Sequence, residues 1–134
     1  MSGLVLKLSP GERVLINGAV IENGDRRARI AVVTPNTHIL RLRDAIHPET
    51  VNTPVRRVAY IAQLVLSGDA EADAARPQLL RGIEQLSRAL TDVDSRALLS
   101  RATDAVLAGD HYQALRALRQ LMPREARLLA GVSG

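Results

Sequence analysis

The residues of this chain whose type and spacing best suit chemistry are arginines. All of its 18 basic side chains except Lys7 are arginine, and the forked guanidinium group matches phosphate and carboxylate oxygens better than an ammonium group does. Two pairs stand two residues apart, Arg27 with Arg29 and Arg41 with Arg43. Residues at i and i+2 of a strand share a face, so each pair can follow a phosphate backbone. A base bias of the genome explains the arginine-rich composition equally well.

The other reactive residue types do not combine into a catalytic or metal site. The absence of cysteine excludes disulfides, thiolate metal sites and a cysteine nucleophile. The histidines His38, His47 and His111 lack the spacing that places two ligands on one helical face. There is no Gly-x-Ser-x-Gly motif and no glycine-rich phosphate loop before a helix. We therefore expect no enzyme, no metal and no other cofactor.

The composition is that of a globular protein of 134 residues. Hydrophobic residues make up 46% and charged residues 24% of the chain, with a formal net charge of +4, which does not fit a disordered chain. The apolar opening Leu4-Val5-Leu6 is broken by Lys7 and has no basic leader, so it predicts neither a signal peptide nor a membrane span. We expect a cytoplasmic protein with no membrane partner.

Turn signals divide the first forty residues into short segments that favour strands. They are Ser9-Pro10-Gly11, Asn17-Gly18, Asn23-Gly24 and Thr34-Pro35-Asn36. The pattern predicts five strands, near residues 4–8, 13–16, 19–22, 26–33 and 39–43. Asn-Gly favours a two-residue hairpin, because both turn positions need positive φ. Two such hairpins place Ile16 opposite Ala19 and Glu22 opposite Asp25.

The period of two along these strands separates an apolar face from a basic one. The predicted core face carries Leu4, Leu6, Leu8, Val14, Ile16, Ile21, Ala28, Ile30, Val32, Leu40 and Leu42. The opposite face mixes Val5, Leu15, Val20 and Glu22 with six cations, which are Lys7, Arg13, Arg27, Arg29, Arg41 and Arg43. We predict that these six cations bind RNA. A bulge at the second turn would instead move Arg27 and Arg29 to the other face.

The alternative to an RNA surface is a solvated sheet whose arginines pair with Glu12, Glu22 or Asp44. One absence also argues against an ordinary RNA module, because single-stranded bases usually stack on aromatic rings. The chain has no Phe or Trp, and neither Tyr60 nor Tyr112 lies in a predicted strand. RNA binding would rely on arginine planes, backbone groups and RNA shape, or on a partner's surface.

Beyond residue 46 the hydrophobic period becomes helical. Residues 47–53 are a predicted connector, and residues 54–134 a helical half. The first helix spans about 54–67, with Thr53 and Gly68 as its caps. A second follows Pro77 and ends at Leu90, a third runs from about Asp94 to Gly109, and a fourth begins after Asp110. Pro123 is expected to interrupt the fourth helix, and residues 124–130 add two more turns.

The predicted fold is therefore α+β. A small antiparallel β-sheet or partly closed barrel of about five strands, residues 1–46, precedes a bundle of four to five helices. The two halves can also form one compact unit. Apolar Val5, Leu15 and Val20 among the outer cations leave room for a protein interface, such as a homo-oligomer.

Several segments resemble the flagellar biosynthesis repressor FlbT family of alphaproteobacteria. The resemblance rests on Leu-x-Leu-Lys-x-x-Pro-Gly-Glu-Arg at residues 4–13, on residues 14–24, and on Arg26-Arg27-Ala28-Arg29. Two later segments agree in order and spacing, Thr53-Pro54-Val55-Arg56-Arg57 and the stretch from Ala108 to Leu129. Together they span nearly the whole chain.

The resemblance implies a post-transcriptional regulator of flagellin synthesis. Such a protein associates with the 5′ untranslated region of flagellin mRNA, favours degradation of the message, and acts alongside the protein FlaF. It brings no catalytic residues and no cofactor. Two further hypotheses stay open: an adaptor that binds FlaF or flagellin and affects the mRNA indirectly, and a ribonuclease supported only by scattered His and Asp. If the six cations are scattered or bound to carboxylates, the predicted docking surface for the transcript is lost and only the family resemblance remains.

Overall fold

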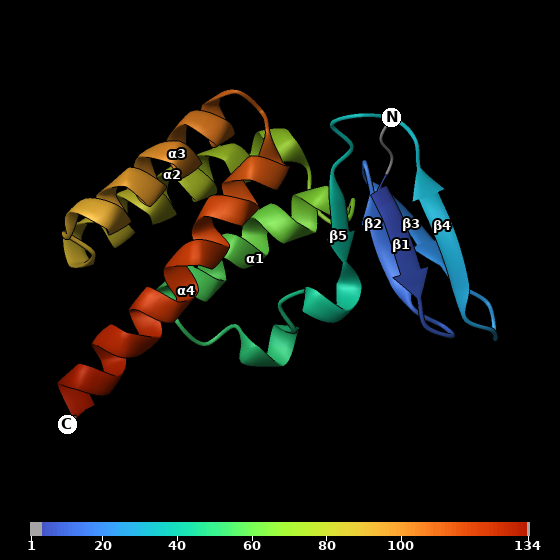
Figure 1. The fold of residues 1–134 in the computed structure, drawn as a ribbon. Coiled ribbons are helices and arrows are strands. Elements are labelled where there is room, and N and C mark those ends of the chain that lie inside the picture. The colour runs from blue at the N-terminus through green and yellow to red at the C-terminus, as the bar shows by residue number, and fades with distance from the viewer. Residues whose placement is uncertain (1–3, 134) are drawn as a thin grey trace. The chain divides into compact units, whose positions relative to one another are not determined.

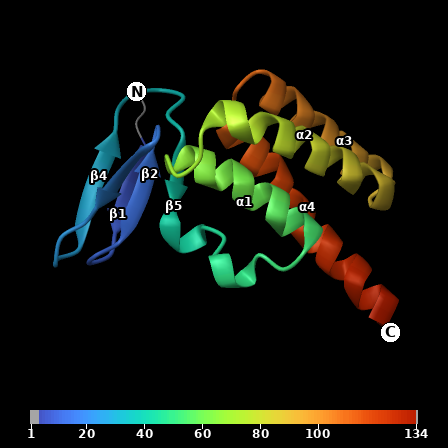
Figure 2. The same cartoon turned by 180° about the vertical axis from the view of Figure 1, so that it is seen from behind.

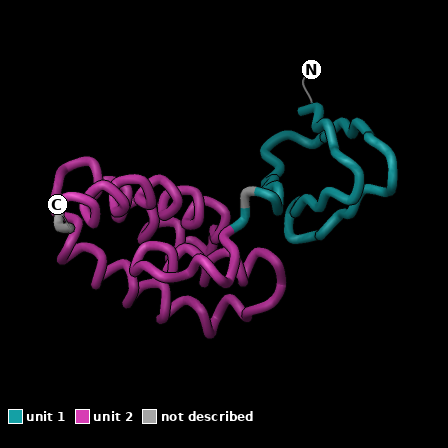
Figure 3. Tube along the Cα trace, turned by 90° about the horizontal axis from the view of Figure 1, so that it is seen from below, with its two compact units in different colours: residues 1–45 teal, residues 46–134 magenta. Residues whose placement is uncertain are grey.

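The structure is a computed structural model that describes residues 4–133, except for the side chains of Asp44, Val132 and Ser133. Within residues 4–133 there are five strands and four α-helices (Figure 1), so the predicted α+β class is confirmed. Contacts along the chain divide it into two compact units, residues 1–45 and residues 46–134 (Figure 3).

The first unit holds all five strands in two small antiparallel sheets. They are β1 (Leu4–Leu8), β2 (Arg13–Ile16), β3 (Ala19–Glu22), β4 (Ala28–Val32) and β5 (Ile39–Arg41). One sheet pairs β1 with β4, and the other has the order β3-β2-β5. A short 3₁₀ turn, η1 (Leu42–Asp44), follows β5. Leu6, Leu8 and Val14 are buried together, and Ile16, Ile30, Val32 and Ile39 pack against them.

The first predicted hairpin is confirmed. Ile16 lies opposite Ala19, and the turn residues Asn17 and Gly18 have φ values of 47° and 88°. The Asn17 side chain also accepts a hydrogen bond from the His38 backbone N–H at 2.9 Å, which ties the hairpin to the start of β5.

The second predicted hairpin is wrong, because β4 pairs with β1 and not with β3. Residues 23 and 24 continue the β2–β3 pairing, since Asn23 N donates to Glu12 O and Gly11 N donates to Gly24 O, both at 2.8 Å. The Asn23 amide also donates to Ser9 O and Arg26 O, each at 2.8 Å. Glu22 therefore lies opposite Arg13 and not opposite Asp25.

The change of partner also corrects the predicted faces. Leu4 and Ile21, expected in the core, are 53% and 40% exposed. Leu15, expected among the outer cations, is buried and lies opposite Leu40, which is also buried. The pleat places both leucines on the face opposite Val14. Arg41 is the strand partner of Val14, so its side chain lies on the same face as Val14. Leu40 was expected on that face.

The second unit is a bundle of four helices, seen from the back in Figure 2. They are α1 (Pro54–Leu66), α2 (Ala72–Ala89), α3 (Val93–Leu107) and α4 (His111–Ser133), preceded by the 3₁₀ turn η2 (Pro48–Thr50). No helix within residues 4–133 has the length and apolar character needed to cross a membrane. The largest side chains with almost no exposure in this unit include Leu79, Leu115, Leu118 and Leu121.

A carboxylate and a hydroxyl group cap the start of α1. Pro54 carries no N–H, Val55 N donates to the buried Glu125 carboxylate of α4 at 2.9 Å, and Arg56 N donates to the predicted cap Thr53 at 3.3 Å. A negative charge is favourable at this end of a helix. Nearer the other end of α1, the buried Gln63 amide bonds both backbone groups of Ile46, at 2.8 and 3.0 Å, and so holds the residue just before the connector against α1.

Pro77 was expected in the link before the second helix, and Pro123 was expected to interrupt the fourth helix; both expectations are wrong. Pro77 lies inside α2 and Pro123 inside α4. A proline removes one backbone hydrogen bond and disfavours a helix by roughly 3 kcal/mol. Buried side chains stand two residues away on both sides, Ala75 and Leu79 around Pro77 and Leu121 and Glu125 around Pro123. The packing of these flanking turns outweighs the local cost.

Helices α1 and α2 approach each other closely at Gly82. A Cβ atom at Gly82 would lie 2.6 Å from Cγ2 of Val58, a residue of α1 that is 6% exposed. Because valine has little rotamer freedom in a helix, the contact cannot be relieved without moving the backbone. Glycine here serves packing at the expense of helix propensity.

We predict that Gly82→Ala lowers the free energy of unfolding by about 1–3 kcal/mol, the usual cost of overpacking. Gly131→Ala is the matched control, because Gly131 is also helical but a Cβ atom added there would meet nothing within 4 Å. The control should be neutral or stabilising by up to about 1 kcal/mol. Urea unfolding followed by circular dichroism measures both.

A double-mutant cycle tests the cause. Gly82→Ala combined with Val58→Ala should cost less than the sum of the two single changes, because the smaller side chain makes room for the new methyl group. Additive losses would show that Val58 is not what excludes a side chain at position 82.

Candidate nucleic-acid interface

The pairing of β1 with β4 brings two of the predicted RNA-binding residues together. Lys7 lies directly opposite Arg29 in this antiparallel pair, so both side chains stand on the same face. Leu6, Leu8 and Ile30 fall on the other face of the pair and contribute to the core. Like charges directly opposite one another oppose strand pairing. The apolar contacts on the opposite face of β1 and β4 therefore keep the strands paired despite the repulsion between Lys7 and Arg29.

A shallow hollow of about 470 Å³ lies beside this pair. It is lined by Lys7, Leu8, Ser9, Arg27, Ala28 and Arg29. All three cations are exposed, and none of their side chains makes an ion pair within the described residues. We call Lys7, Arg27 and Arg29 the cation trio. Three uncompensated positive charges around one concave surface create a potential that attracts anions.

The other three predicted cations do not join this surface. Arg13 pairs with Glu22 at 2.7 Å across β2 and β3. Arg41 donates to both oxygens of Glu12, at 2.7 and 2.8 Å, and Arg43 lies 3.9 Å from the same carboxylate. The expectation of one face with six cations is thus wrong. The six cations do not share a face because β4 and β5 belong to different sheets and because Arg43 lies in η1 rather than in a strand.

The alternative interpretation, in which arginines pair with carboxylates, is confirmed for Glu12 and Glu22. Asp44, the third acid it named, has a side chain outside the described residues. The six residues therefore fall into an unpaired trio, Lys7, Arg27 and Arg29, and a paired set, Arg13, Arg41 and Arg43. Whether any of them contacts RNA stays a prediction.

Glu12 is a structural centre of the strand unit. Its side chain is only 6% exposed and accepts hydrogen bonds from Arg41 and from the Ser9 backbone N–H at 2.9 Å. Arg41 also donates to the Lys7 backbone carbonyl. These contacts join the end of β1, the start of β2 and the end of β5. The hydrogen bond from Arg41 and that from Ser9 lower the pKa of the Glu12 carboxyl from its ordinary 4.5 to about 2.

Sequence reasoning named Glu12 only as one of three acids that could pair with the arginines, and it missed the burial of Glu12 and the pairing of Lys7 with Arg29. Glu12 closes the Ser9-Pro10-Gly11 turn, and that local signal was available. No local signal identified Arg41 as its charge partner, because that contact depends on which strand lies beside β2. Among the described residues there is also no group of three His, Cys, Asp or Glu side chains placed to hold a metal ion.

The sequence is similar to one protein family over most of its length. The family model described as "Flagellar protein FlbT" matches residues 4–129. No solved structure matches the chain.

Curated relatives give the same result. The chain is 34% identical over 129 residues to the "Probable flagellum biosynthesis repressor protein FlbT" of Mesorhizobium japonicum. The aligned residues are 96% of this chain and 86% of the relative. It is 29% identical over 130 residues to the protein of the same name from Caulobacter sp. (strain K31), covering 97% and 98%. "Probable flagellum biosynthesis repressor protein FlbT 1" of Bradyrhizobium diazoefficiens is 35% identical over 128 residues, covering 93% and 84%.

We predict that Glu12→Gln destabilises the strand unit at neutral pH and flattens its response to acid. Because the folded-state pKa of about 2 lies below the ordinary value of 4.5, the ionised Glu12 stabilises the fold above about pH 4.5. That contribution disappears as the pH falls from 4.5 towards 2. Urea midpoints read from NMR signals of β1 and β2 across this pH range measure the effect.

Glu22→Gln serves as the comparison. Its ion pair with Arg13 has side-chain exposures of 58% and 61%, and such surface pairs contribute about 1 kcal/mol or less. The two variants should therefore differ clearly in midpoint at neutral pH. A Glu12→Gln protein with the wild-type acid response would contradict the assigned role of this carboxylate.

Proposed function

The chain belongs to the FlbT family, and we propose that it represses flagellum biosynthesis by binding the 5′ untranslated region of flagellin mRNA. The repressor role is supported by the names of relatives that cover nearly the whole chain. The RNA step is supported by the cation trio around the hollow at β1 and β4. That trio is the observation on which the proposal depends.

The physical case for phosphate at this site is that no carboxylate of the described residues forms an ion pair with its three cations. Arg13, Arg41 and Arg43 already face carboxylates, so an RNA phosphate would have to compete with Glu12 or Glu22 for them. The cation trio has no such competitor within the described residues. A phosphate bound there removes repulsion between Lys7 and Arg29 in addition to gaining its own attraction.

The chemistry of the hollow limits how RNA is recognised. The chain contains no Phe or Trp, and its two tyrosines, Tyr60 and Tyr112, lie in α1 and α4. Contacts at the hollow are then mainly guanidinium and ammonium groups to phosphate, with guanidinium planes available for stacking on bases. We propose that the leader is selected largely by its shape, because phosphate contacts position a nucleic acid without reading its sequence.

Binding alone is enough for repression in this scheme. Protein on the leader either blocks the ribosome or exposes the message to the nucleases of the cell. The chain itself supplies no catalytic group in this proposal, so RNA incubated with pure protein should remain intact. Cleavage that survives full purification and disappears with a single side-chain change would favour the ribonuclease hypothesis instead.

A second candidate function, a protein-interaction adaptor, has one observation in its favour. Strand β3 is an edge of its sheet, all four of its residues are exposed, and Val20 and Ile21 are 50% and 40% exposed. An exposed apolar edge strand is a common place for a partner to bind. FlaF or flagellin would be the partner, and the effect on mRNA would be indirect.

We predict that changing the cation trio to glutamine abolishes binding of a flagellin leader RNA at moderate salt. Each single-strand phosphate contact contributes about −0.7 to the logarithmic salt slope, so losing three contacts should reduce the slope by about 2. Fluorescence anisotropy at several salt concentrations measures affinity and slope together.

The matched control removes the same charge elsewhere. Arg81, Arg101 and Arg116 are exposed residues of α2, α3 and α4, and their change to glutamine should leave most of the affinity. Equal loss in both triple variants would mean that only net charge matters, and no loss in the trio variant would place the RNA elsewhere. Retained co-purification of FlaF with an RNA-deficient trio variant would separate the adaptor activity from RNA binding.

A further inference from the structure

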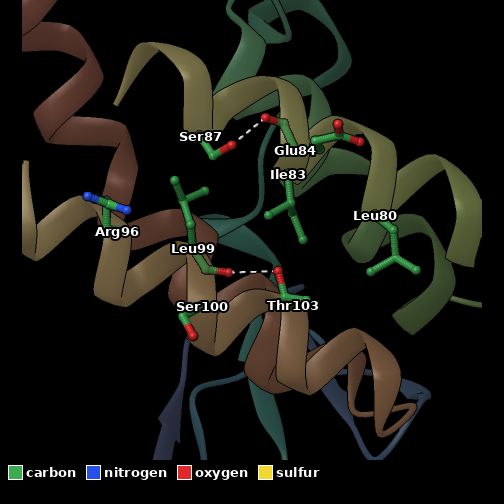
Figure 4. A pocket seen from close by; sticks show the side chains of 8 residues that line it. All are labelled: Leu80, Ile83, Glu84, Ser87, Arg96, Leu99, Ser100 and Thr103. Atoms are coloured by element: carbon green, nitrogen blue, oxygen red, sulfur yellow. Dashed lines mark hydrogen bonds between the residues drawn. The ribbon is translucent and has the colours of Figure 1, made fainter. Parts of the chain in front are cut away.

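Two hollows of the helical unit differ in charge from the hollow at the cation trio. The groove between α2 and α3, shown in Figure 4, has a volume of about 310 Å³ and is lined by an acid, Glu84, as well as a base, Arg96. A hollow of about 450 Å³ between the α2–α3 turn and α4 contains Arg124, which pairs with Asp92 and Asp94. Both hollows thus have an acid at hand. The hollow at β1 and β4 has none among its described lining residues.

The three charges of the cation trio stand close together. Directly opposite residues of an antiparallel pair have Cβ atoms about 5 Å apart, which applies to Lys7 and Arg29. Arg27 precedes Arg29 by two positions, a separation of roughly 7 Å along an extended chain. All three line one hollow of about 470 Å³, a volume within the range of small-ligand sites. The positive charge is therefore concentrated in one place.

The positive charge also ends within the same two strands. The next pair on the face of Lys7 and Arg29 is Val5 with Ala31, and both residues are exposed and uncharged. A protein that follows the backbone of a single strand presents a groove of cations along its path. The β1–β4 pair instead has cations at one end of this face and apolar side chains at the other. Such a surface suits a compact anion better than a long backbone.

A triphosphate has the charge distribution that this surface requires. Each backbone phosphate of RNA carries one negative charge and is separated from the next by a ribose. In a terminal triphosphate, a single oxygen atom separates neighbouring phosphorus atoms. The last phosphate carries nearly two charges at neutral pH, because its second pKa is about 6. A triphosphate therefore brings enough negative charge into one hollow to compensate all three cations.

We propose that the cation trio binds the 5′-triphosphate end of the leader RNA. The inference rests on the proposed function, because it names the part of the transcript that occupies the same hollow. The guanidinium groups of Arg27 and Arg29 each suit two oxygens of a phosphate, and the Lys7 ammonium adds a third positive charge. The Ser9 hydroxyl also lines the hollow and is a further donor.

Binding of an end explains how RNA is held without aromatic rings in the strands. A triphosphate is recognised through its oxygens, so no base has to stack on the protein. A transcript that still has its original 5′ end carries this group, whereas a dephosphorylated end does not. A free nucleoside triphosphate carries the same group, so the experiment has to separate the two sources.

Three leader RNAs of identical sequence, ending in a 5′-triphosphate, a 5′-monophosphate or a 5′-hydroxyl, test the proposal. Fluorescence anisotropy with a label at the 3′ end is measured at low salt, where weakened variants still bind. The triphosphate RNA should have a dissociation constant about tenfold or more below that of the hydroxyl RNA, because its extra charges face the cation trio. Changing the cation trio to glutamine should reduce this preference to about twofold or less.

Arg27→Gln and Arg26→Gln are matched single variants. Both residues are exposed neighbouring arginines, but only Arg27 lines the hollow. Arg27 also precedes β4, so its change leaves the paired residues of the strand untouched, and circular dichroism checks the fold. Arg27→Gln should lose most of the preference for the triphosphate RNA, and Arg26→Gln should keep it. Equal losses in the two variants would overturn the assignment to this hollow.

The remaining outcomes distinguish this inference from the proposed function. Equal affinity for all three RNAs, lost equally when the trio is changed, would overturn the triphosphate site and leave binding of the leader in place. If none of the RNAs binds, the proposed function itself is wrong. ATP is titrated separately by calorimetry. ATP binding that depends on the trio, without any preference among the RNAs, would overturn the RNA end as the ligand in favour of a free nucleotide.

Discussion

The strand unit depends most on the ion pair and hydrogen bonds of the Glu12 carboxylate. A carboxylate with 6% exposure is costly unless it is paired and hydrogen-bonded. Arg41 supplies two charged hydrogen bonds, and the turn before β2 supplies the Ser9 N–H. Because the same arginine also reaches the Lys7 carbonyl, one charge pair connects strands of both sheets. This explains why the pKa of Glu12 falls so far below its ordinary value.

The same interaction decides which cations remain available. An arginine bound to a carboxylate on two atoms adds little to the potential outside the protein, so Arg41 attracts an external anion less strongly than its sequence position suggested. Lys7 and Arg29 are kept side by side by the β1–β4 pairing and by the apolar residues behind it. The distribution of charge over the surface is therefore a consequence of strand pairing rather than of local sequence.

This difference marks what could be predicted from the sequence. Several signals confined to a few neighbouring residues were correct, since the Asn17-Gly18 turn, the Thr53 cap and the first three strands agree with the structure. The partner of β4 was not predictable in this way, because Asn23-Gly24 resembles a hairpin turn but extends the β2–β3 pairing. With that partner wrong, the common face of six cations was wrong as well. The helices α2 and α4 likewise continue through their prolines because tertiary packing outweighs local propensity.

The cation trio adds a final physical argument for ligand binding at the strands. Opposed like charges at Lys7 and Arg29 destabilise the β1–β4 pair by a few tenths of a kcal/mol up to about 1 kcal/mol. An anion bound between them removes that cost, so ligand binding and strand stability favour each other. A phosphate bound here as proposed would gain more free energy than at three isolated surface cations, because part of the gain would come from relief of repulsion already present in the free protein. The paired arginines would not add free energy in this way, because carboxylates already compensate their charges.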